Sequence, residues 1–357
     1  MLMAPMRLFN ISQILAVFIL LSFNLYAEEA FNWGTAGDKN ASIYLQRALK
    51  NFRKKKDVVI AVIDTGIDPT HPFIKNNIYV PNSSRSLTHF GFDFSKGATS
   101  QTRPFDEHGH GTHISGIIKN IYKDVKILSL KYYNPRATGE ENLASTILAL
   151  KFAIDNNVDI INYSGGGPEA SQEEYQLLIK AKEKGILVVA ASGNEEANID
   201  LKNSSYYPAS YGLDNIITVT AHDINLNILP SSNYGKLSVD VSAPGDKIRS
   251  SLPFGRMGNL TGTSQATAFV SGVAALIKSE HPEFNALTIK QIIKSSSILH
   301  QKLKGKCANG AINAGKALAL AKSLSTNHKR NLASSEFHLE GKKLSSGKII
   351  YRFNSAP

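Results

Sequence analysis

Three segments far apart in the chain carry side chains that together could perform acyl transfer. Ser264 lies among small residues at the start of a long apolar stretch, and Asp64 ends a run of β-branched residues. Between them in the chain stands a cluster of histidines, His108, His110 and His113. A serine hydroxyl becomes a nucleophile when an imidazole takes its proton and a carboxylate orients that imidazole. The residue types therefore predict serine-based nucleophilic catalysis.

A side-chain amide adds a fourth group to this set. Asn194 stands between Gly193 and Glu195, directly after an apolar run. An amide at such a place can donate a hydrogen bond to the oxyanion of a tetrahedral intermediate. Taken alone, Asn194 also fits a turn and Ser264 also fits a helix N-cap, so both readings stay open on these segments.

The serine is predicted to begin a buried helix. From Ser264 to Glu280 the apolar residues recur at helical spacing, and the opposite side carries only small residues. The first N–H groups of a helix have no partner within it and favour negative charge near them. A serine on that first turn is therefore well placed to carry developing negative charge.

The remaining elements alternate between strands and helices. Residues 58–63 form a continuous β-branched run, which is typical of a parallel strand buried on both faces. Further strands are predicted at 125–130, 158–162, 186–191, 216–220 and 238–241, and helices at 142–156, 172–184, 287–297 and 312–324. This alternation predicts an α/β fold: one domain with a doubly wound, mostly parallel sheet and helices on both faces. Polar residues after such strands lie where α/β sheets hold their sites.

The segments that carry these residues resemble motifs of the subtilisin-like serine proteases, in the order of that family. Residues 64–68, 110–116 and 262–266 resemble its Asp, His and Ser motifs. Residues 190–195 resemble its oxyanion segment, and residues 164–167 resemble its substrate-binding segment. The resemblance extends over about residues 31 to 322.

The resemblance implies a role for each matched residue. Ser264 would be the nucleophile, His110 the general base and then the general acid, and Asp64 the residue that orients His110. Asn194 and the Ser264 N–H would form the oxyanion hole. The implied substrate-binding residues are Ser164, Gly165, Gly166 and Glu195. The implied function is a serine endopeptidase, and the alternative is a catalytically silent relative that binds peptides in the same cleft.

Two departures from the family pattern concern specificity. Gly165 stands where the family usually has leucine, and Gln265 where it usually has methionine. We expect the glycine to open the cleft, while the backbone of residues 164–167 still pairs with an extended substrate. Glu195 and Glu196 are expected near the pocket for the side chain that precedes the scissile bond, which predicts some acceptance of Lys or Arg there.

Two other kinds of site share parts of these motifs. The spacing of His108, His110 and His113 could suit zinc, but no His-Glu-x-x-His pattern accompanies it. Asp64-Thr65-Gly66 also occurs in aspartic proteases, but no second Asp-Thr-Gly or Asp-Ser-Gly exists in the chain. We therefore expect no catalytic metal and no required cofactor.

A third departure concerns calcium. Phe73 stands where well-known members of the family have a calcium-binding aspartate, and residues 116–121 run almost directly into the next strand. The loop that would complete the site is missing, so we expect the family's strong calcium site to be absent.

The ends of the chain differ from the 28–324 peptidase domain. Residues 1–27 have the features of a secretory signal: Arg7 is the only charge, residues 14–21 are apolar, and Leu25-Tyr26-Ala27 resembles a cleavage site. We expect a secreted or periplasmic protein; an uncleaved anchor is the alternative. Only about 30 residues separate the signal from the first strand, so we expect no folding prodomain.

Basic charge is concentrated at the C-terminal end. The 357-residue chain has a net charge of +11, and residues 301–357 hold eleven Lys and Arg against two Asp and Glu, a net of +9. No nucleic-acid-binding motif accompanies this charge, so residues 325–357 are interpreted as a basic tail. Cys307 is the one cysteine and excludes an internal disulfide. We expect polypeptide substrates, no nucleic acid, no membrane segment after the signal, and a monomer.

Overall fold

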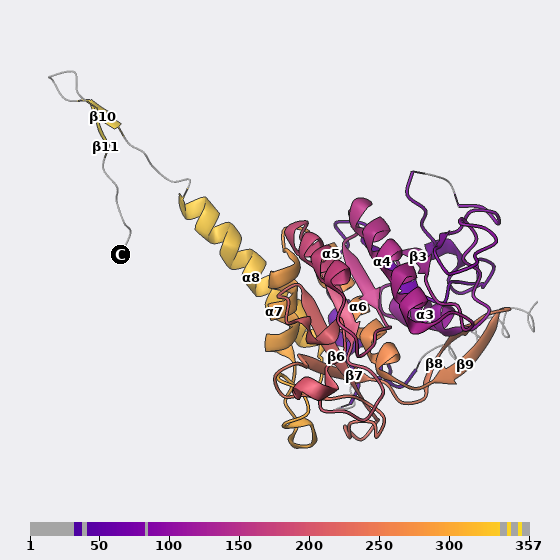
Figure 1. Ribbon diagram of the computed structural model, residues 1–357. Coiled ribbons are helices and arrows are strands. Elements are labelled where there is room, and N and C mark those ends of the chain that lie inside the picture. The colour runs from indigo at the N-terminus through magenta and orange to yellow at the C-terminus, as the bar shows by residue number, and fades with distance from the viewer. Residues whose placement is uncertain (1–31, 38–40, 83–84, 336–340, 344–348, 352–357) are drawn as a thin grey trace, which may run out of the picture.

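A seven-stranded parallel sheet forms the centre of the molecule (Figure 1), in the order β2-β3-β1-β4-β5-β6-β7. The computed structural model describes residues 32–37, 41–82, 85–335, 341–343 and 349–351, so the predicted signal at 1–27 lies outside the described residues. The sheet comprises β1 (Val59–Asp64), β2 (Phe92–Asp93), β3 (Lys126–Lys131), β4 (Ile160–Tyr163), β5 (Leu187–Ala191), β6 (Ile216–His222) and β7 (Val241–Pro244).

Helices cover both faces of this sheet. The described helices are α2 (Leu45–Leu49), α3 (His110–Ile121), α4 (Gly139–Asp155), α5 (Gln172–Glu183), α6 (Thr263–Glu280), α7 (Ala286–Ser296) and α8 (Ala314–Ser335). Alternate residues of β1 enter two different cores, as the two-residue period of a strand requires. Ile60 and Val62 pack in the core that contains α3, α6 and α7, whereas Ala61 and Ile63 pack in the core under α4 and α5. The predicted doubly wound α/β fold is confirmed.

The predicted central helix is α6, and nearly all of its residues are buried. It crosses the sheet against β4, β5, β6 and β7. Its small residues allow close neighbours, because a Cβ added at Gly272 would lie 2.8 Å from the Cβ of Ile121 on α3. The two helices that carry His110 and Ser264 are thereby packed directly together.

One hairpin was not anticipated from the sequence. β8 (Ile248–Leu252) and β9 (Arg256–Leu260) pair antiparallel beside the sheet and lead directly into α6. Serine, arginine and glycine interrupt the apolar pattern of these strands, so no strand signal of period two stands out. His113 holds the hairpin, since its Nε2 contacts the backbone oxygens of Ile248 at 2.9 Å and Gly258 at 3.2 Å.

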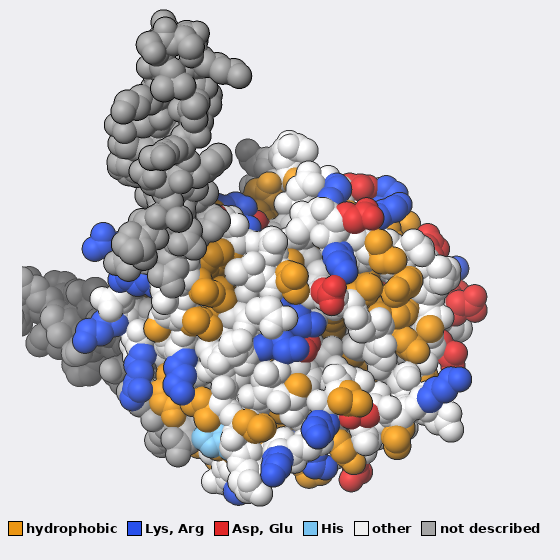
Figure 2. Space-filling model, turned by 90° about the vertical axis from the view of Figure 1, so that its left-hand side faces the viewer, with side chains coloured by type: hydrophobic (Ala, Val, Ile, Leu, Met, Phe, Trp, Pro, Cys, Tyr) orange, Lys and Arg blue, Asp and Glu red, His pale blue; other side chains and the backbone are white. Residues whose placement is uncertain are grey.

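The C-terminal helix is longer than predicted. α8 continues to Ser335 and leaves the domain, and a short antiparallel pair follows it, formed by β10 (Gly341–Lys343) and β11 (Ile349–Tyr351). The predicted tail at 325–357 therefore begins inside a helix. Figure 2 shows the face from which α8 leaves, where Lys and Arg gather near the grey segment and most Asp and Glu lie towards the other side.

Two further observations concern the described residues. None of their helices combines the length and the apolar character that crossing a membrane requires.

Cys307 is buried, and its burial raises the pKa of the thiol to about 11, so it packs as a small apolar residue.

Candidate active site

The carboxylate and the imidazole predicted to act together are in direct contact. His110 Nδ1 lies 2.7 Å from Asp64 Oδ1, so the ring donates this hydrogen bond to the carboxylate. The Asp64 side chain is 3% exposed and the His110 side chain 23% exposed. Asp64 Oδ1 also accepts the Thr65 N–H at 2.8 Å. The contact fixes the tautomer of His110, with Nε2 left to accept a proton.

The electrostatics of the pair favour a charged imidazole. Burial alone would lower the pKa of His110, but the charge of Asp64 and its hydrogen bond raise that pKa above the ordinary value. Among the described residues, no hydrogen bond reaches His110 Nε2, so this nitrogen is available to a reacting group.

A buried aspartate, Asp106, holds the start of α3, and sequence reasoning assigned it no role. Its Oδ1 accepts the Gly109 N–H at 2.7 Å and the Thr65 hydroxyl at 2.8 Å, and its Oδ2 accepts the Thr112 N–H at 2.8 Å. Thr65 Oγ1 in turn accepts the Gly111 N–H at 2.9 Å. These bonds satisfy the free N–H groups of the helix and join it to the residue after Asp64.

Ser264 is the second residue of α6 and is 7% exposed. Its hydroxyl donates to the backbone oxygen of Ser164 at 3.0 Å. The Ser164 side chain is held by Asn162 Nδ2 at 2.7 Å, and Asn162 Oδ1 accepts the hydroxyl of Ser271 on α6 at 2.8 Å. In this structure the Ser264 hydroxyl therefore faces Ser164, and among the described residues no hydrogen bond joins it to His110.

Asn194 lies beside the start of the same helix. Its Oδ1 accepts the Thr263 N–H at 3.0 Å and the Thr263 hydroxyl at 3.2 Å. Because both contacts use the oxygen, the Nδ2 donors remain available to another acceptor. Gly193 makes the preceding turn at φ +102°, where an added Cβ would lie 2.4 Å from both Asn233 Nδ2 and Glu195 Oε2.

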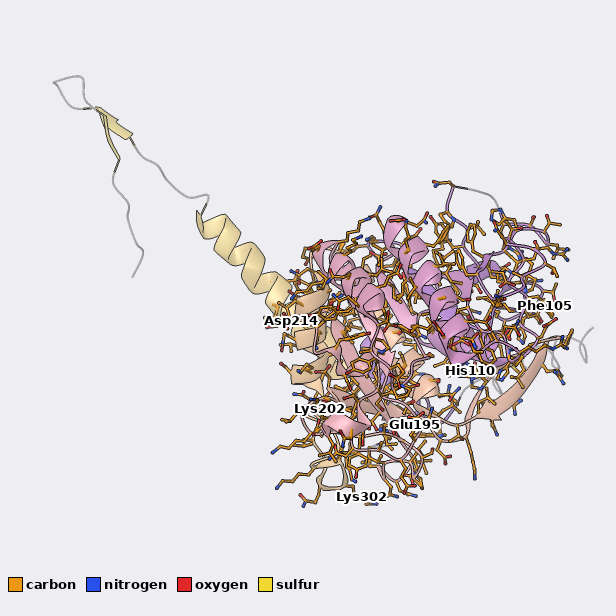
Figure 3. All side chains as sticks on the ribbon, viewed as in Figure 1. Phe105, His110, Glu195, Lys202, Asp214 and Lys302 are labelled. Carbon is orange, nitrogen blue, oxygen red and sulfur yellow. The ribbon has the colours of Figure 1, made fainter. Side chains whose placement is uncertain are left out.

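The sheet brings these groups to one edge. Asp64 ends β1, Ser164 follows β4 and Asn194 follows β5, and these three strands are neighbours with a spacing of about 4.8 Å. In Figure 3, His110 and Glu195 lie on this side of the domain, whereas Asp214, which precedes β6, lies at the other. The edge thus gathers a hydroxyl, an imidazole with its carboxylate, and a free amide donor, which is the equipment of acyl transfer.

The other two histidines of the cluster make separate contacts. His113 is fully buried, and burial lowers its pKa to about 4, so it stays neutral between α3 and the β8–β9 hairpin. His108 packs edge-on against Tyr133. Among the described residues, no group of three or more His, Cys, Asp or Glu is arranged to hold a metal ion.

The segment predicted to bind substrate differs from expectation in two ways. A Cβ added at Gly165 would lie 2.4 Å from Tyr132 Oη, so tyrosine fills space that we expected the glycine to open. Gly167 already exchanges both of its backbone hydrogen bonds with Tyr207, at 3.0 and 2.8 Å. Within the described part of the chain, the backbones of Gly165 and Gly166 remain unpaired, which limits an added strand to residues 164–166.

Glu195 stands directly after Asn194 and is exposed, but its carboxylate is not free. Glu195 Oε2 accepts Asn233 Nδ2 at 2.6 Å, and Asn233 Oδ1 accepts the N–H groups of Glu195 at 3.0 Å and of Ala197 at 2.8 Å. Asn233 thereby fixes the loop that follows Asn194. Nothing in the sequence pattern around Asn233 indicated this role.

The surroundings of Phe73 do not fit a calcium site. The Lys119 ammonium lies over the Phe73 ring, 3.7 Å from its centroid, and donates to the Phe73 backbone oxygen at 2.6 Å. Calcium needs several oxygen ligands, whereas this position offers an aromatic ring and a cation.

Comparison with known proteins agrees with the fold. The sequence model of the Subtilase family matches residues 55–334. Subtilisin amylosacchariticus of Bacillus subtilis subsp. amylosacchariticus is 34% identical over 249 residues, which cover 68% of this chain and 60% of that protein. Subtilisin of Bacillus pumilus is 34% identical over 250 residues, covering 68% of this chain and 84% of its own length.

A third relative carries a name that points to another compartment. The major intracellular serine protease of Bacillus subtilis (strain 168) is 34% identical over 239 residues, covering 64% of this chain and 71% of that protein. The match to Subtilisin amylosacchariticus spans about 60% of that relative's length. The family match covers more than three quarters of the chain, with the seven strands of the central sheet and the site segments inside it. This chain belongs to the subtilase family.

Proposed function

We propose that this chain is a serine endopeptidase that hydrolyses peptide bonds through an acyl-enzyme on Ser264. The observation that carries the proposal is the 2.7 Å contact between His110 and Asp64. Ser264, on the first turn of α6, contacts Ser164, which follows the strand next to β1. The names of the relatives, subtilisins and a serine protease, support the same activity.

In the acylation step, Ser264 Oγ forms a bond to the carbonyl carbon of the scissile peptide while its proton passes to His110 Nε2. Asp64 stabilises the imidazolium that results, as the raised pKa of His110 indicates. When the tetrahedral intermediate collapses, the C–N bond breaks and His110 Nε2 gives the proton to the leaving amine. Water then attacks the acyl-enzyme with His110 as base, and Ser264 regains its proton.

The oxyanion of each intermediate would be stabilised by two donors. Asn194 Nδ2 is available because the amide oxygen is engaged by Thr263. The N–H of Ser264 is on the first turn of α6, where the helix leaves its N–H groups without internal partners. Both donors are fixed before substrate arrives, so little reorganisation accompanies the development of charge.

Substrate would bind as an extended strand beside residues 164–166. The unpaired backbones of Gly165 and Gly166 support this placement. Glu195 would face the side chain that precedes the scissile bond and would favour Lys or Arg there.

The proposed steps use only side chains and backbone of this chain. We also propose that the family's strong calcium site is absent, which the pairing of Lys119 with Phe73 supports.

The signal-like residues 1–27 support export, although one relative is named as intracellular. N-terminal sequencing of protein collected outside the cytoplasm tests export, and a chain found only in the cytoplasm with residues 1–27 intact would overturn it.

A fluorophosphonate probe tests the activity against the alternative of a silent peptide-binding protein. An active serine hydrolase is labelled at Ser264, and the intact chain hydrolyses unfolded protein substrates. A silent relative would bind peptides with neither labelling nor hydrolysis. The contact of His110 with Asp64, and the contact of Asn194 with Thr263 beside Ser264, support the active enzyme.

A further inference from the structure

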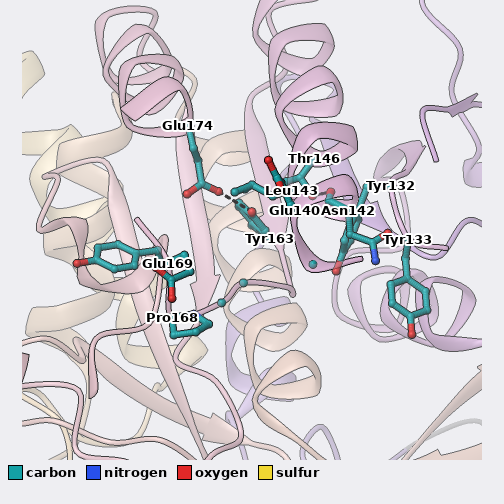
Figure 4. Close-up of a pocket in the computed structure, with 14 residues that line it drawn as sticks. Tyr132, Tyr133, Glu140, Asn142, Leu143, Thr146, Tyr163, Pro168, Glu169 and Glu174 are labelled. Atoms are coloured by element: carbon teal, nitrogen blue, oxygen red, sulfur yellow. Dashed lines mark hydrogen bonds between the residues drawn. The ribbon is translucent and has the colours of Figure 1, made fainter. Parts of the chain in front are cut away.

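A large cavity opens beside the segment proposed to hold substrate. It encloses about 650 Å³, and its walls include Tyr132, Tyr133 and Tyr207, with Gly166 and Gly167 at one side. Figure 4 shows Tyr132 and Tyr133 on one side of this space and Pro168 and Glu169 on the other. A volume of this size accommodates the longest protein side chains with room for water.

The position of the cavity relates it to Ser264. The backbone oxygen of Ser164 accepts the Ser264 hydroxyl, and Gly166 and Gly167 line the cavity two and three residues further on. Extended chain advances about 3.3 Å per residue, so the cavity lies roughly 7–10 Å along the segment from Ser164, the residue that contacts Ser264. A substrate residue a few positions from the scissile bond would therefore direct its side chain into it.

The charges around the cavity have one sign. Glu174 lines it from α5, and Glu140 and Glu169 line it from the surface. Among the residues that the structure describes, no lysine or arginine lines this cavity. Aromatic walls with carboxylates at the floor and the rim suit a side chain that has an apolar stem and a cationic tip.

Glu174 is the group at the floor. It is 1% exposed, and its two oxygens accept the hydroxyls of Tyr163 at 2.6 Å and of Tyr211 at 2.8 Å. Figure 4 shows its carboxylate reaching from α5 to Tyr163 at the cavity. Each oxygen can accept two hydrogen bonds, so each keeps one direction for a further donor.

A neutral apolar side chain would fit this cavity less well. It would remove water from the exposed carboxylates of Glu140 and Glu169 and offer no hydrogen bond to them or to Glu174, which costs free energy. A guanidinium or ammonium replaces that water with charged donors, and its methylene groups cover the tyrosine rings.

We infer that Glu174 is a specificity-determining residue of a subsite, several residues away from the scissile bond, that selects an arginine or lysine side chain of the polypeptide substrate. The inference rests on the proposed peptidase function. It concerns a site separate from Glu195, which lies beside Asn194 next to the reacting groups.

Peptide hydrolysis tests the inference on the full chain. A peptide set places arginine, lysine, norleucine or glutamate at each of four positions on either side of the scissile bond. We expect one position, not adjacent to that bond, at which kcat/KM is at least about tenfold higher for arginine than for norleucine, the size typical of a charge-assisted hydrogen bond. At that position, Glu174→Gln should reduce the preference to within about twofold of unity, through a fall in kcat/KM for the arginine peptide.

Glu173→Gln is the matched control, because Glu173 is the exposed neighbour of Glu174 on α5 and does not line the cavity. It should keep the full preference. If Glu174→Gln proves unstable, the double variant Glu140→Gln, Glu169→Gln removes the two carboxylates at the rim of the cavity. This variant should also weaken the preference for arginine over norleucine. A preference absent from every position away from the scissile bond, or unchanged in these variants, would overturn the inference.

Equilibrium binding separates this inference from the proposed function. Ser264→Ala protein should bind the arginine peptide about tenfold more tightly than the norleucine peptide, measured by fluorescence anisotropy. Selective binding without hydrolysis or labelling of the unaltered chain would refute the peptidase and leave the subsite standing. Hydrolysis with no selectivity would refute the subsite alone.

Discussion

Thr65 Oγ1 donates to Asp106 Oδ1 at 2.8 Å, and both side chains are buried. The bond ties the residue after Asp64 to the carboxylate that holds the N-terminus of α3. Since His110 is the first residue of α3, Thr65 and Asp106 set the distance between His110 and Asp64. They are positioning residues, and neither touches the reacting atoms in the proposed mechanism.

Removal of the Asp106 carboxylate is predicted to reduce the stability of the fold. Asp106→Ala would leave the N–H groups of Gly109 and Thr112 and the hydroxyl of Thr65 without their acceptor. We expect a loss of about 3 kcal/mol in the free energy of unfolding, since these are buried bonds to a charged group. Urea unfolding in the Ser264→Ala background measures it without self-digestion.

Asp155→Asn provides the comparison for that measurement. Asp155 forms a surface ion pair with Lys151, and its side chain is 56% exposed. Its replacement should change stability by less than about 0.5 kcal/mol. An equal loss in the free energy of unfolding in the two variants would contradict the role given to Asp106.

The Asp64–His110 contact predicts a specific pH dependence. Only neutral His110 can accept the Ser264 proton, and its pKa is raised above the ordinary value. Thus kcat/KM should fall as the pH decreases through that raised pKa. Asp64→Asn should shift this acidic limb of the kcat/KM pH profile to lower pH and reduce kcat about 10⁴-fold, because the orienting carboxylate is lost. An unchanged limb in the variant would show that Asp64 does not act on His110.

Asn194→Ala tests the proposed oxyanion donor. We expect kcat to fall about 10²–10³-fold with little change in KM; subtilisin is itself the reference case for this magnitude. Asn233→Ala is an informative companion, since Asn233 holds the same loop without facing the reacting groups. It should perturb stability more than kcat. A normal kcat in Asn194→Ala would remove Asn194 from the mechanism.

Chelation tests the calcium proposal. With Lys119 paired to Phe73, we expect EDTA to leave the thermal midpoint of the Ser264→Ala protein unchanged. A ligand that stabilised the folded state would make the midpoint depend on its concentration. A fall of several degrees in EDTA, restored by added calcium, would show that the folded chain does bind the ion.

The sheet and its helices could be predicted because β-branched runs such as residues 58–63 and the apolar face of α6 carry strong periodic signals. The local sequence around Asp64, His110 and Ser264 also pointed to their chemistry. Their supporting contacts could not be predicted in the same way. Asp106, Asn162 and Asn233 act through partners distant in sequence, and a lone polar residue in a loop does not reveal such a partner.

The shape of the cleft could not be predicted from the sequence for the same reason. Gly165 suggested open space, but Tyr132 comes from the end of β3 and fills it. The cavity lined by Glu174 likewise combines α4, α5 and the segment after β4, which are brought together only by the fold. Side chains that converge from several elements leave no periodic pattern in any one of them.

The central claim is that the hydroxyl of Ser264 attacks the scissile carbonyl. The most direct measurement is the rate of peptide hydrolysis by the purified full chain and by its Ser264→Ala variant, under conditions in which both are folded by circular dichroism. We predict a fall in kcat of about 10⁶-fold, the size known for subtilisin, together with loss of fluorophosphonate labelling. Hydrolysis by the alanine variant at a rate close to that of the unaltered chain would contradict the account.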